Sequence, residues 1–146
     1  MCWHSYKRPV RKTADKDITC WKVVYLVNTY FKSVYFGKLY KIHKRYFIYD
    51  DEIYVHKVFA YSFFTPTTRY YINKGFHSYN NKVFIKEAGL QRIVMNENKK
   101  MWHDRFYGMS NLHVIKCIIP EGSIYYENED GELVSSSIKI IGLDED

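Results

Sequence analysis

The run LHVIKCIIPEGSIYYENEDGELVSSSIKIIG, residues 112–142, decides the fold class of this chain. Its β-branched and aromatic residues fall into three strand-like pieces, HVIKCII, SIYY and SSSIKII. Residues 120–122 (PEG) predict a turn after the first piece, and Asp130-Gly131 is a typical dipeptide for a hairpin loop. We therefore expect an antiparallel sheet in which HVIKCII is a central strand.

The rest of the chain extends this β pattern toward the N-terminus. Residues 17–27 (DITCWKVVYLV) predict a buried strand, and 33–42 and 46–59 continue the strand-like composition. Residues 64–72 predict a short extended piece that begins with a turn at Pro66. We expect residues 1–17, which are polar and basic, to form an extended lead-in.

One segment has a different character. Between about residues 82 and 107 the apolar residues recur at mixed helical spacing among good helix formers. Asn80 or Asn81 would cap this helix. The predicted fold is therefore α+β: a single mostly-β domain over 1–146, with a twisted or split antiparallel sheet and one main helical segment at about 82–107.

Composition and cysteine usage limit the class of protein. A chain of 146 residues with 47% hydrophobic content is long enough to bury one core. Its three cysteines form no CxxC pair, which argues against a disulfide framework or a zinc finger, and the histidines are too dispersed to predict a metal site. The N-terminus lacks the apolar core of a signal peptide, and no run is long enough to span a membrane. We expect a cytoplasmic protein with no membrane partner and buried, reduced thiols at Cys20 and Cys117.

The charge is distributed unevenly along the chain. Residues 1–116 carry 21 Lys and Arg against 8 Asp and Glu, whereas residues 117–146 carry 1 against 8. This asymmetry is typical of a basic part that meets an anionic partner. The alternative is that the acidic segment folds against the basic body and neutralises it.

The string His-Ser-Tyr occurs twice, at residues 4–6 and 77–79. The second copy lies in GFHSYNN, between a predicted strand and the predicted helix, where backbone N–H groups favour an anion. The predicted ligand-binding residues are His77, Ser78, Tyr79, Tyr71 and Arg69. A purely structural role, as a capped turn with a hydrogen-bonded histidine, is the alternative. The repeated string also invites comparison with enzymes that cleave phosphodiesters with two His-x-Ser/Thr motifs. Here serine directly follows histidine, so on a strand His77 and Ser78 would point to opposite faces, which argues against such an enzyme.

Two other stretches, 38–47 and 99–107, mix basic and aromatic residues. Lysine and arginine neutralise phosphates, and exposed aromatic rings stack on bases, so these stretches predict a nucleic-acid or nucleotide surface. Its residues would be Lys41, Lys44, Arg45, Lys99, Lys100, Trp102 and Arg105. A solvated strand face that alternates with core aromatics would produce the same pattern.

The motifs DITCWKVV, GFHSYNN and IPEGSIYY…VS resemble a group of small uncharacterised proteins of gut bacteria and their phages. The resemblance spans most of the chain, and the C-terminal motif is its most specific part. It implies a small accessory protein encoded by a phage or mobile element, with no established activity.

At the level of fold, the chain also resembles ADP-ribosyltransferase-like domains, which arrange a split sheet around a nucleotide cleft. This resemblance implies an enzyme that uses NAD, with His77 and Glu132 as catalytic residues and Tyr70 or Tyr71 stacking on the nucleotide. Two features depart from that pattern. The first strand carries Cys20 and Trp21 rather than Arg or His, and Glu132 falls in the predicted hairpin loop.

Three functions follow from these patterns. The first is binding of an anionic nucleotide or nucleic acid, without a cofactor. The second is the NAD-dependent enzyme. The third is an inhibitor that binds a host protein through a basic, tyrosine-rich face.

Overall fold

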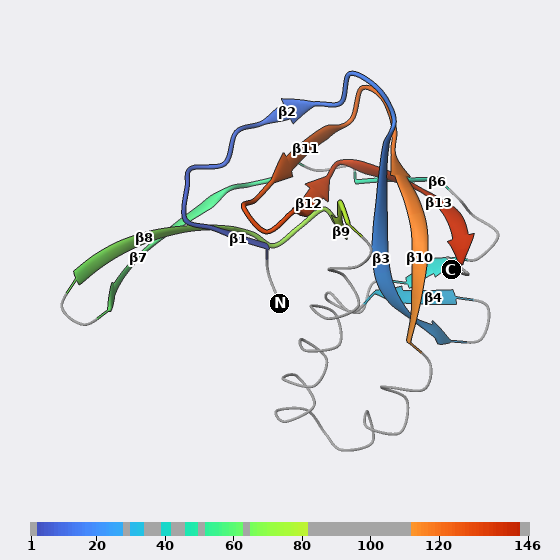
Figure 1. Cartoon of the computed structure of the whole chain (residues 1–146), viewed down its shortest axis with the longest axis horizontal. Helices are drawn as coiled ribbons and strands as arrows, with labels where there is room; N and C mark the ends of the chain where they lie inside the picture. Colours follow the sequence, from blue (N-terminus) through green and yellow to red (C-terminus); the bar gives the residue numbers. More distant parts are fainter. Residues whose placement is uncertain are drawn as a thin grey trace, which may run out of the picture.

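The computed structural model describes residues 3–27, 30–33, 39–41, 46–49, 52–62, 65–81 and 112–143. These ranges hold thirteen strands, which Figure 1 shows in sequence colours. They are β1 (Trp3–Ser5), β2 (Lys12–Thr13), β3 (Ile18–Val27), β4 (Tyr30–Ser33), β5 (Leu39–Lys41), β6 (Tyr46–Ile48), β7 (His56–Ser62), β8 (Thr65–Ile72), β9 (Phe76–Tyr79), β10 (Leu112–Ile119), β11 (Ile124–Glu127), β12 (Glu132–Ser135) and β13 (Ser137–Leu143).

The described residues contain no helix, so the predicted α+β class is wrong for them, and this part of the chain is all β. The predicted helix at about 82–107 lies outside the described residues. Several strands are short pieces, such as β1, β2 and β9, that the local sequence pattern does not mark. Each is completed by pairing with a strand far away in the sequence, and local periodicity carries no information on such pairing.

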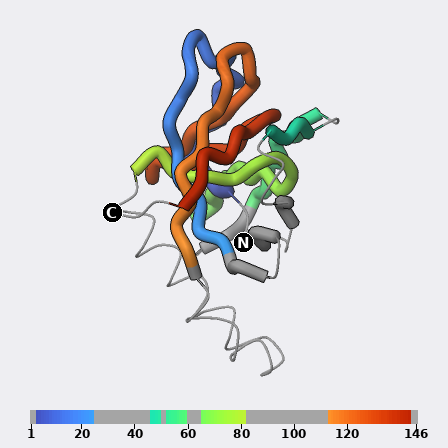
Figure 2. Tube along the Cα trace, turned by 90° about the vertical axis from the view of Figure 1, so that its right-hand side faces the viewer, coloured from blue at the N-terminus to red at the C-terminus, as the bar shows by residue number. Residues whose placement is uncertain are grey.

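The larger sheet is built around β3 and β10. These strands pair antiparallel from Ile18 opposite Ile119 to Tyr25 opposite Leu112, and they run side by side in Figures 1 and 2. The strand order is β2-β11-β12-β9-β3-β10-β13-β6, and β4 and β5 extend from β3. The prediction of a central strand at HVIKCII is confirmed, because β10 is paired on both sides.

The predicted hairpin is also confirmed. Strands β11 and β12 pair antiparallel, with Glu127 opposite Leu133. The loop between them is closed by a hydrogen bond of 3.2 Å from the Gly131 backbone N–H to the Asn128 backbone oxygen. Gly131 has a φ of +77°, a backbone conformation that glycine adopts without steric cost.

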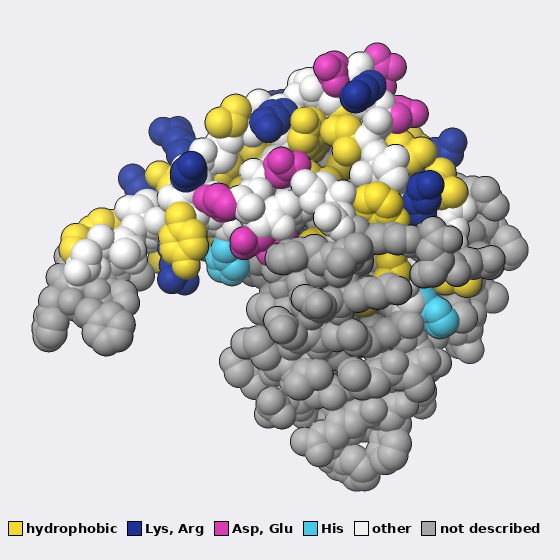
Figure 3. Space-filling model, in the orientation of Figure 1, with side chains coloured by type: hydrophobic (Ala, Val, Ile, Leu, Met, Phe, Trp, Pro, Cys, Tyr) yellow, Lys and Arg dark blue, Asp and Glu magenta, His cyan; other side chains and the backbone are white. Residues whose placement is uncertain are grey.

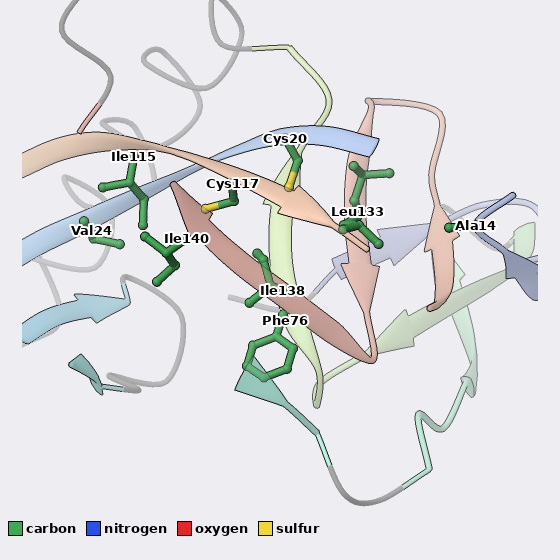
Figure 4. Packing of buried hydrophobic residues seen from close by; sticks show 10 residues of the cluster. Ala14, Cys20, Val24, Phe76, Ile115, Cys117, Leu133, Ile138 and Ile140 are labelled. Atoms are coloured by element: carbon green, nitrogen blue, oxygen red, sulfur yellow. The ribbon is translucent and has the colours of Figure 1, made fainter. Parts of the chain in front are cut away.

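The larger sheet is covered on both faces around β9 and β12. Successive residues of a strand point to opposite faces, and each face carries its own apolar cluster. The first cluster, drawn in part in Figure 4, contains Ala14, Cys20, Val24, Phe76, Ile115, Cys117, Ile119, Leu133, Ile138 and Ile140. The second contains Trp3, Ile72, Tyr126 and Val134. This double coverage buries all four residues of both β9 and β12.

A second sheet has three strands in the order β1-β8-β7. Strands β7 and β8 form a two-stranded arm that leaves the body of the molecule (Figure 1). Trp3 lies opposite Ile72, and both are buried in the second cluster. His4 lies opposite Tyr71. Because neighbouring residues alternate, His4 and Tyr71 point to the other face of this small sheet, away from that cluster.

Candidate functional site

The segment GFHSYNN is not an exposed turn. Residues 76–79 form β9, which pairs with β12 and with Trp21 of β3. His77 is 4% exposed, Ser78 1% and Tyr79 2%. The prediction of a turn at these residues is therefore wrong, because they form a strand whose pairing with two distant strands buries their side chains.

His77 has partners that hold the fold together. Its Nε2 lies 3.0 Å from the backbone oxygen of Asn73, within hydrogen-bonding distance. Its own backbone oxygen accepts a hydrogen bond from Nζ of Lys22, a buried side chain on β3. These contacts tie the link between β8 and β9 to the centre of the larger sheet. They agree with the structural interpretation of a hydrogen-bonded histidine.

Glu132 is the first residue of β12 rather than a loop residue, and it lies opposite Tyr79. It therefore shares a face of the sheet with Tyr79 and, on the diagonal, with His77, as the NAD-dependent hypothesis requires. Trp3 covers this face, and its Nε1 donates a hydrogen bond of 2.7 Å to the Glu132 backbone oxygen. All three side chains are buried, so none of them is accessible to NAD in this structure.

Arg69 and Tyr71, the other two predicted ligand-binding residues, occupy a different place. Both lie on β8, two residues apart, so they share the face of the small sheet that points away from the core. His4 of β1 and His56 of β7 lie opposite Tyr71 from its two sides. We call the surface formed by His4, Tyr6, His56, Arg69 and Tyr71 the outer face.

The side chains of the outer face form two rows. In the first row the rings of His56 and Tyr71 stack with centroids 4.8 Å apart and planes 17° apart, and the His4 ring lies 6.3 Å from Tyr71 on a tilted plane. In the second row the Arg69 guanidinium lies 5.0 Å from the centroid of the Tyr6 ring. Tyr6 remains 67% exposed. The outer face therefore offers aromatic rings and a cation directly to solvent.

Two exposed basic residues, Lys7 and Arg8, follow Tyr6 directly in the chain. Lys57 lies opposite Tyr70 on the other face of the small sheet, and Lys12 lies opposite Tyr125 in the larger sheet. In Figure 3, Lys and Arg side chains lie around the base of the β7–β8 arm, with Asp and Glu side chains beside them. The Glu129 carboxylate is one acidic group at this place, because it accepts hydrogen bonds from the backbone of Tyr6 and Lys7.

Glu129 fixes the position of Tyr6 on this face. Its Oε1 accepts hydrogen bonds from Ser5 Oγ at 3.0 Å, from the Tyr6 N–H at 3.2 Å and from the Lys7 N–H at 3.1 Å. Partial burial acts to raise the pKa of the Glu129 carboxyl, but its own backbone N–H and those of Lys7 and Tyr6, with the Ser5 hydroxyl, hold that pKa below its usual range. The charged form of the Glu129 carboxylate is therefore the one that holds the end of β1 in place.

We expect Glu129→Gln to lower the free energy of unfolding at pH 7 by about 1 kcal/mol, because the hydrogen bonds to a charged acceptor weaken. A lowered folded-state pKa contributes stability above the ordinary glutamate value of about 4.3, and that contribution is lost as the pH falls through the lowered value. The difference in unfolding free energy between Glu129→Gln and the unchanged protein should therefore become smaller as the pH falls. Thermal unfolding followed by circular dichroism between pH 7 and pH 3 measures it, with Glu121→Gln as the control. An equal difference at every pH would contradict a role for the charge.

The predicted basic and aromatic surface falls mostly outside the described residues. Lys41 is the last residue of β5. Lys44, Arg45, Lys99, Lys100, Trp102 and Arg105 lie outside the described residues. Within the described ranges, no three His, Cys, Asp or Glu side chains are grouped so that they could hold a metal ion.

No family model, curated protein or solved structure matches this chain. In the part of the chain that the structure describes, there is no helix of the length and apolarity needed to cross a membrane.

Sequence reasoning selected Arg69 and Tyr71 but missed His4, Tyr6 and His56. The first copy of His-Ser-Tyr carried a usable signal, because alternation along a strand places His4 and Tyr6 on one face and Ser5 on the other. The buried Trp3 and Ser5 confirm that alternation. In the first copy His4 and Tyr6 are exposed and Ser5 is buried, whereas all three residues of the second copy are buried.

Proposed function

We propose that the protein binds single-stranded nucleic acid on the outer face. The observation that carries this proposal is the exposed pair of rows, in which Tyr6 is combined with Arg69, and Tyr71 with His4 and His56. Aromatic rings stack on unpaired bases, and arginine and lysine neutralise the phosphates between them.

The shape of the outer face favours a strand of nucleotides over a single nucleotide. Tyr71 and Arg69 are two residues apart on β8, so the rows are separated by about 7 Å along the strand. Successive unstacked bases can each meet one row at such a separation. The exposed Lys7 and Arg8 follow Tyr6 directly in the chain, and their charges suit a ligand with several phosphates. A duplex keeps its bases stacked inside, and it offers only its phosphates to this surface.

Fluorescence anisotropy with a labelled oligonucleotide tests the proposal. We expect single-stranded DNA or RNA to bind more tightly than a duplex of the same length, and more tightly than NAD or a mononucleotide in competition. Affinity should fall steeply with salt, because each neutralised phosphate releases counterions.

Two substitutions localise the binding. Tyr6→Ala should cost about 1 to 3 kcal/mol of binding free energy through lost stacking, and Arg69→Ala should weaken binding and reduce its salt dependence. The matched controls are Tyr46→Ala on β6 and Lys139→Ala on β13, which change exposed residues of the larger sheet. If the controls weaken binding as much as Tyr6→Ala and Arg69→Ala do, the outer face is not the site. Absence of binding at low salt would reject the function itself.

A further inference from the structure

Cys20 and Cys117 face each other across the two central strands. Cys20 of β3 lies directly opposite Cys117 of β10 in the antiparallel register. Both are free thiols and both are fully buried. Figure 4 shows the two side chains leaving neighbouring strands toward the same apolar cluster. The prediction that both thiols are buried and free is confirmed. That they lie opposite each other follows from the strand register, which no local sequence pattern indicates.

The register brings these cysteines within the range of a disulfide. Directly opposed residues of an antiparallel pair have Cα atoms about 4.5 to 5.5 Å apart. Disulfides join cysteines whose Cα atoms are about 4.4 to 6.8 Å apart. A bond between Cys20 and Cys117 therefore requires rotation of the side chains and little movement of the backbone.

The surroundings of the two thiols differ. The hydrogen bond from Cys117 outweighs the effect of burial and lowers the pKa of Cys20, and the Ser78 hydroxyl and the Lys22 ammonium act in the same direction. Burial raises the pKa of Cys117, and the hydrogen bond to Cys20 and the charge of Cys20 add to this effect. Because a thiolate is the nucleophilic form, Cys20 is the thiol suited to react first and Cys117 the one suited to react with its product.

We propose that Cys20 and Cys117 form a redox-active dithiol, which a small hydroperoxide such as hydrogen peroxide converts into a disulfide between β3 and β10. In the first step the Cys20 thiolate attacks one peroxide oxygen and the O–O bond breaks. The leaving hydroxide takes up the proton lost by the thiol and becomes water, and Cys20 becomes a sulfenic acid. In the second step the Cys117 sulfur attacks the Cys20 sulfur, and the hydroxyl leaves with the Cys117 proton as a second water. Two thiols are oxidised by two electrons, and one peroxide is reduced to two waters.

Because both thiols are buried, the oxidant must be small and uncharged to reach them. Hydrogen peroxide is small and uncharged, so it can enter during local opening of the sheet. The bond would close a loop of nearly one hundred residues between the two most central strands, and long loops lose the most unfolded-chain entropy when they are closed. The oxidised protein should therefore melt about 5 to 10 °C higher than the reduced one.

The test uses the full chain with Cys2→Ser, so that only the two opposed thiols remain. The folded protein is treated with hydrogen peroxide, and free thiols are then counted with a maleimide under denaturing conditions. We expect both thiols to disappear together, one peptide pair that links Cys20 to Cys117, the higher melting temperature, and full reversal by dithiothreitol. In Cys117→Ala, a sulfenic-acid trap such as dimedone should label Cys20, with no rise in melting temperature.

Three results would overturn the proposal. They are thiols that persist after oxidation of the folded protein, oxidation that requires denaturant, and a bond that links two chains instead of one. Peptide mapping of the protein that keeps both cysteines decides these points even if Cys117→Ala does not fold.

Discussion

Replacing Trp3 with alanine is expected to lower the free energy of unfolding by about 3 to 5 kcal/mol, the usual cost of truncating a buried tryptophan. The Trp3 side chain is 0% exposed, and it packs with Ile72, Tyr126 and Val134. Its Nε1 also donates to the Glu132 backbone oxygen. The substitution therefore removes the contact through which β1 holds the small sheet against the larger one.

A second variant at Trp3 and a control at Val10 separate the packing of the Trp3 ring from its hydrogen bond. Trp3→Phe keeps an aromatic ring but loses the donor, and we expect it to cost less, about 1 to 2 kcal/mol. Val10→Ala changes an exposed residue of the same N-terminal segment and should have almost no effect. Urea unfolding followed by circular dichroism gives the three values. A cost below about 1 kcal/mol for Trp3→Ala would show that the N-terminal segment is not part of the cooperative unit.

Gly75→Ala is the second substitution with a large expected effect, about 3 kcal/mol of destabilisation. Gly75 connects β8 to β9 with a φ of +121°, which residues with a Cβ rarely adopt. A Cβ there would lie 2.9 Å from Val134 Cγ2 and 3.3 Å from the Ser135 backbone oxygen. Backbone strain and crowding against β12 therefore act together.

Gly122→Ala is the matched control for this prediction. Gly122 also has a positive φ, of +87°, but a Cβ at this position meets no atom within 4 Å. We expect its substitution to cost only the strain, about 1 kcal/mol. Thermal unfolding of both variants separates the cost of backbone strain, which both share, from the cost of crowding, which only Gly75→Ala carries. Equal losses of stability would mean that close approach to Val134 has no part in the requirement for glycine at position 75.

The parts of the fold that could be predicted are those that depend on neighbouring residues. The apolar runs of β3 and β10 are long enough to mark strands without their partners. The loop before Glu132 was predicted because Asp130-Gly131 is itself a turn signal. In both cases the information lies within about ten consecutive residues.

Strand β9 could not be predicted in the same way. It has four residues, and its strand conformation and burial come from pairing with Trp21 and with residues 132–135, which are more than fifty positions away. The glycine before it and the asparagines after it are typical of a turn. This non-local pairing moved the predicted site residues His77, Ser78 and Tyr79 into the interior.

Only part of the outer face could be predicted from the sequence, for the same reason. Arg69 and Tyr71 could be selected from one stretch of sequence, because they alternate on a single strand. His4 and His56 join Tyr71 only through the pairing of β1 and β7 with β8. No local pattern connects residues 4, 56 and 71, so their assembly into a row required the three-dimensional structure.

The central pairing of β3 with β10 also affects how the chain is made. About 90 residues separate Val27 at the end of β3 from Ile119 at the end of β10. At about 5 to 20 residues per second, a ribosome needs roughly 5 to 20 seconds to add them. During that time the edge of β3 that will receive β10 stays open on the nascent chain, and such unpaired apolar edges promote aggregation. Synthesis in cells should therefore depend on chaperones that shield β3 until β10 has emerged from the ribosome.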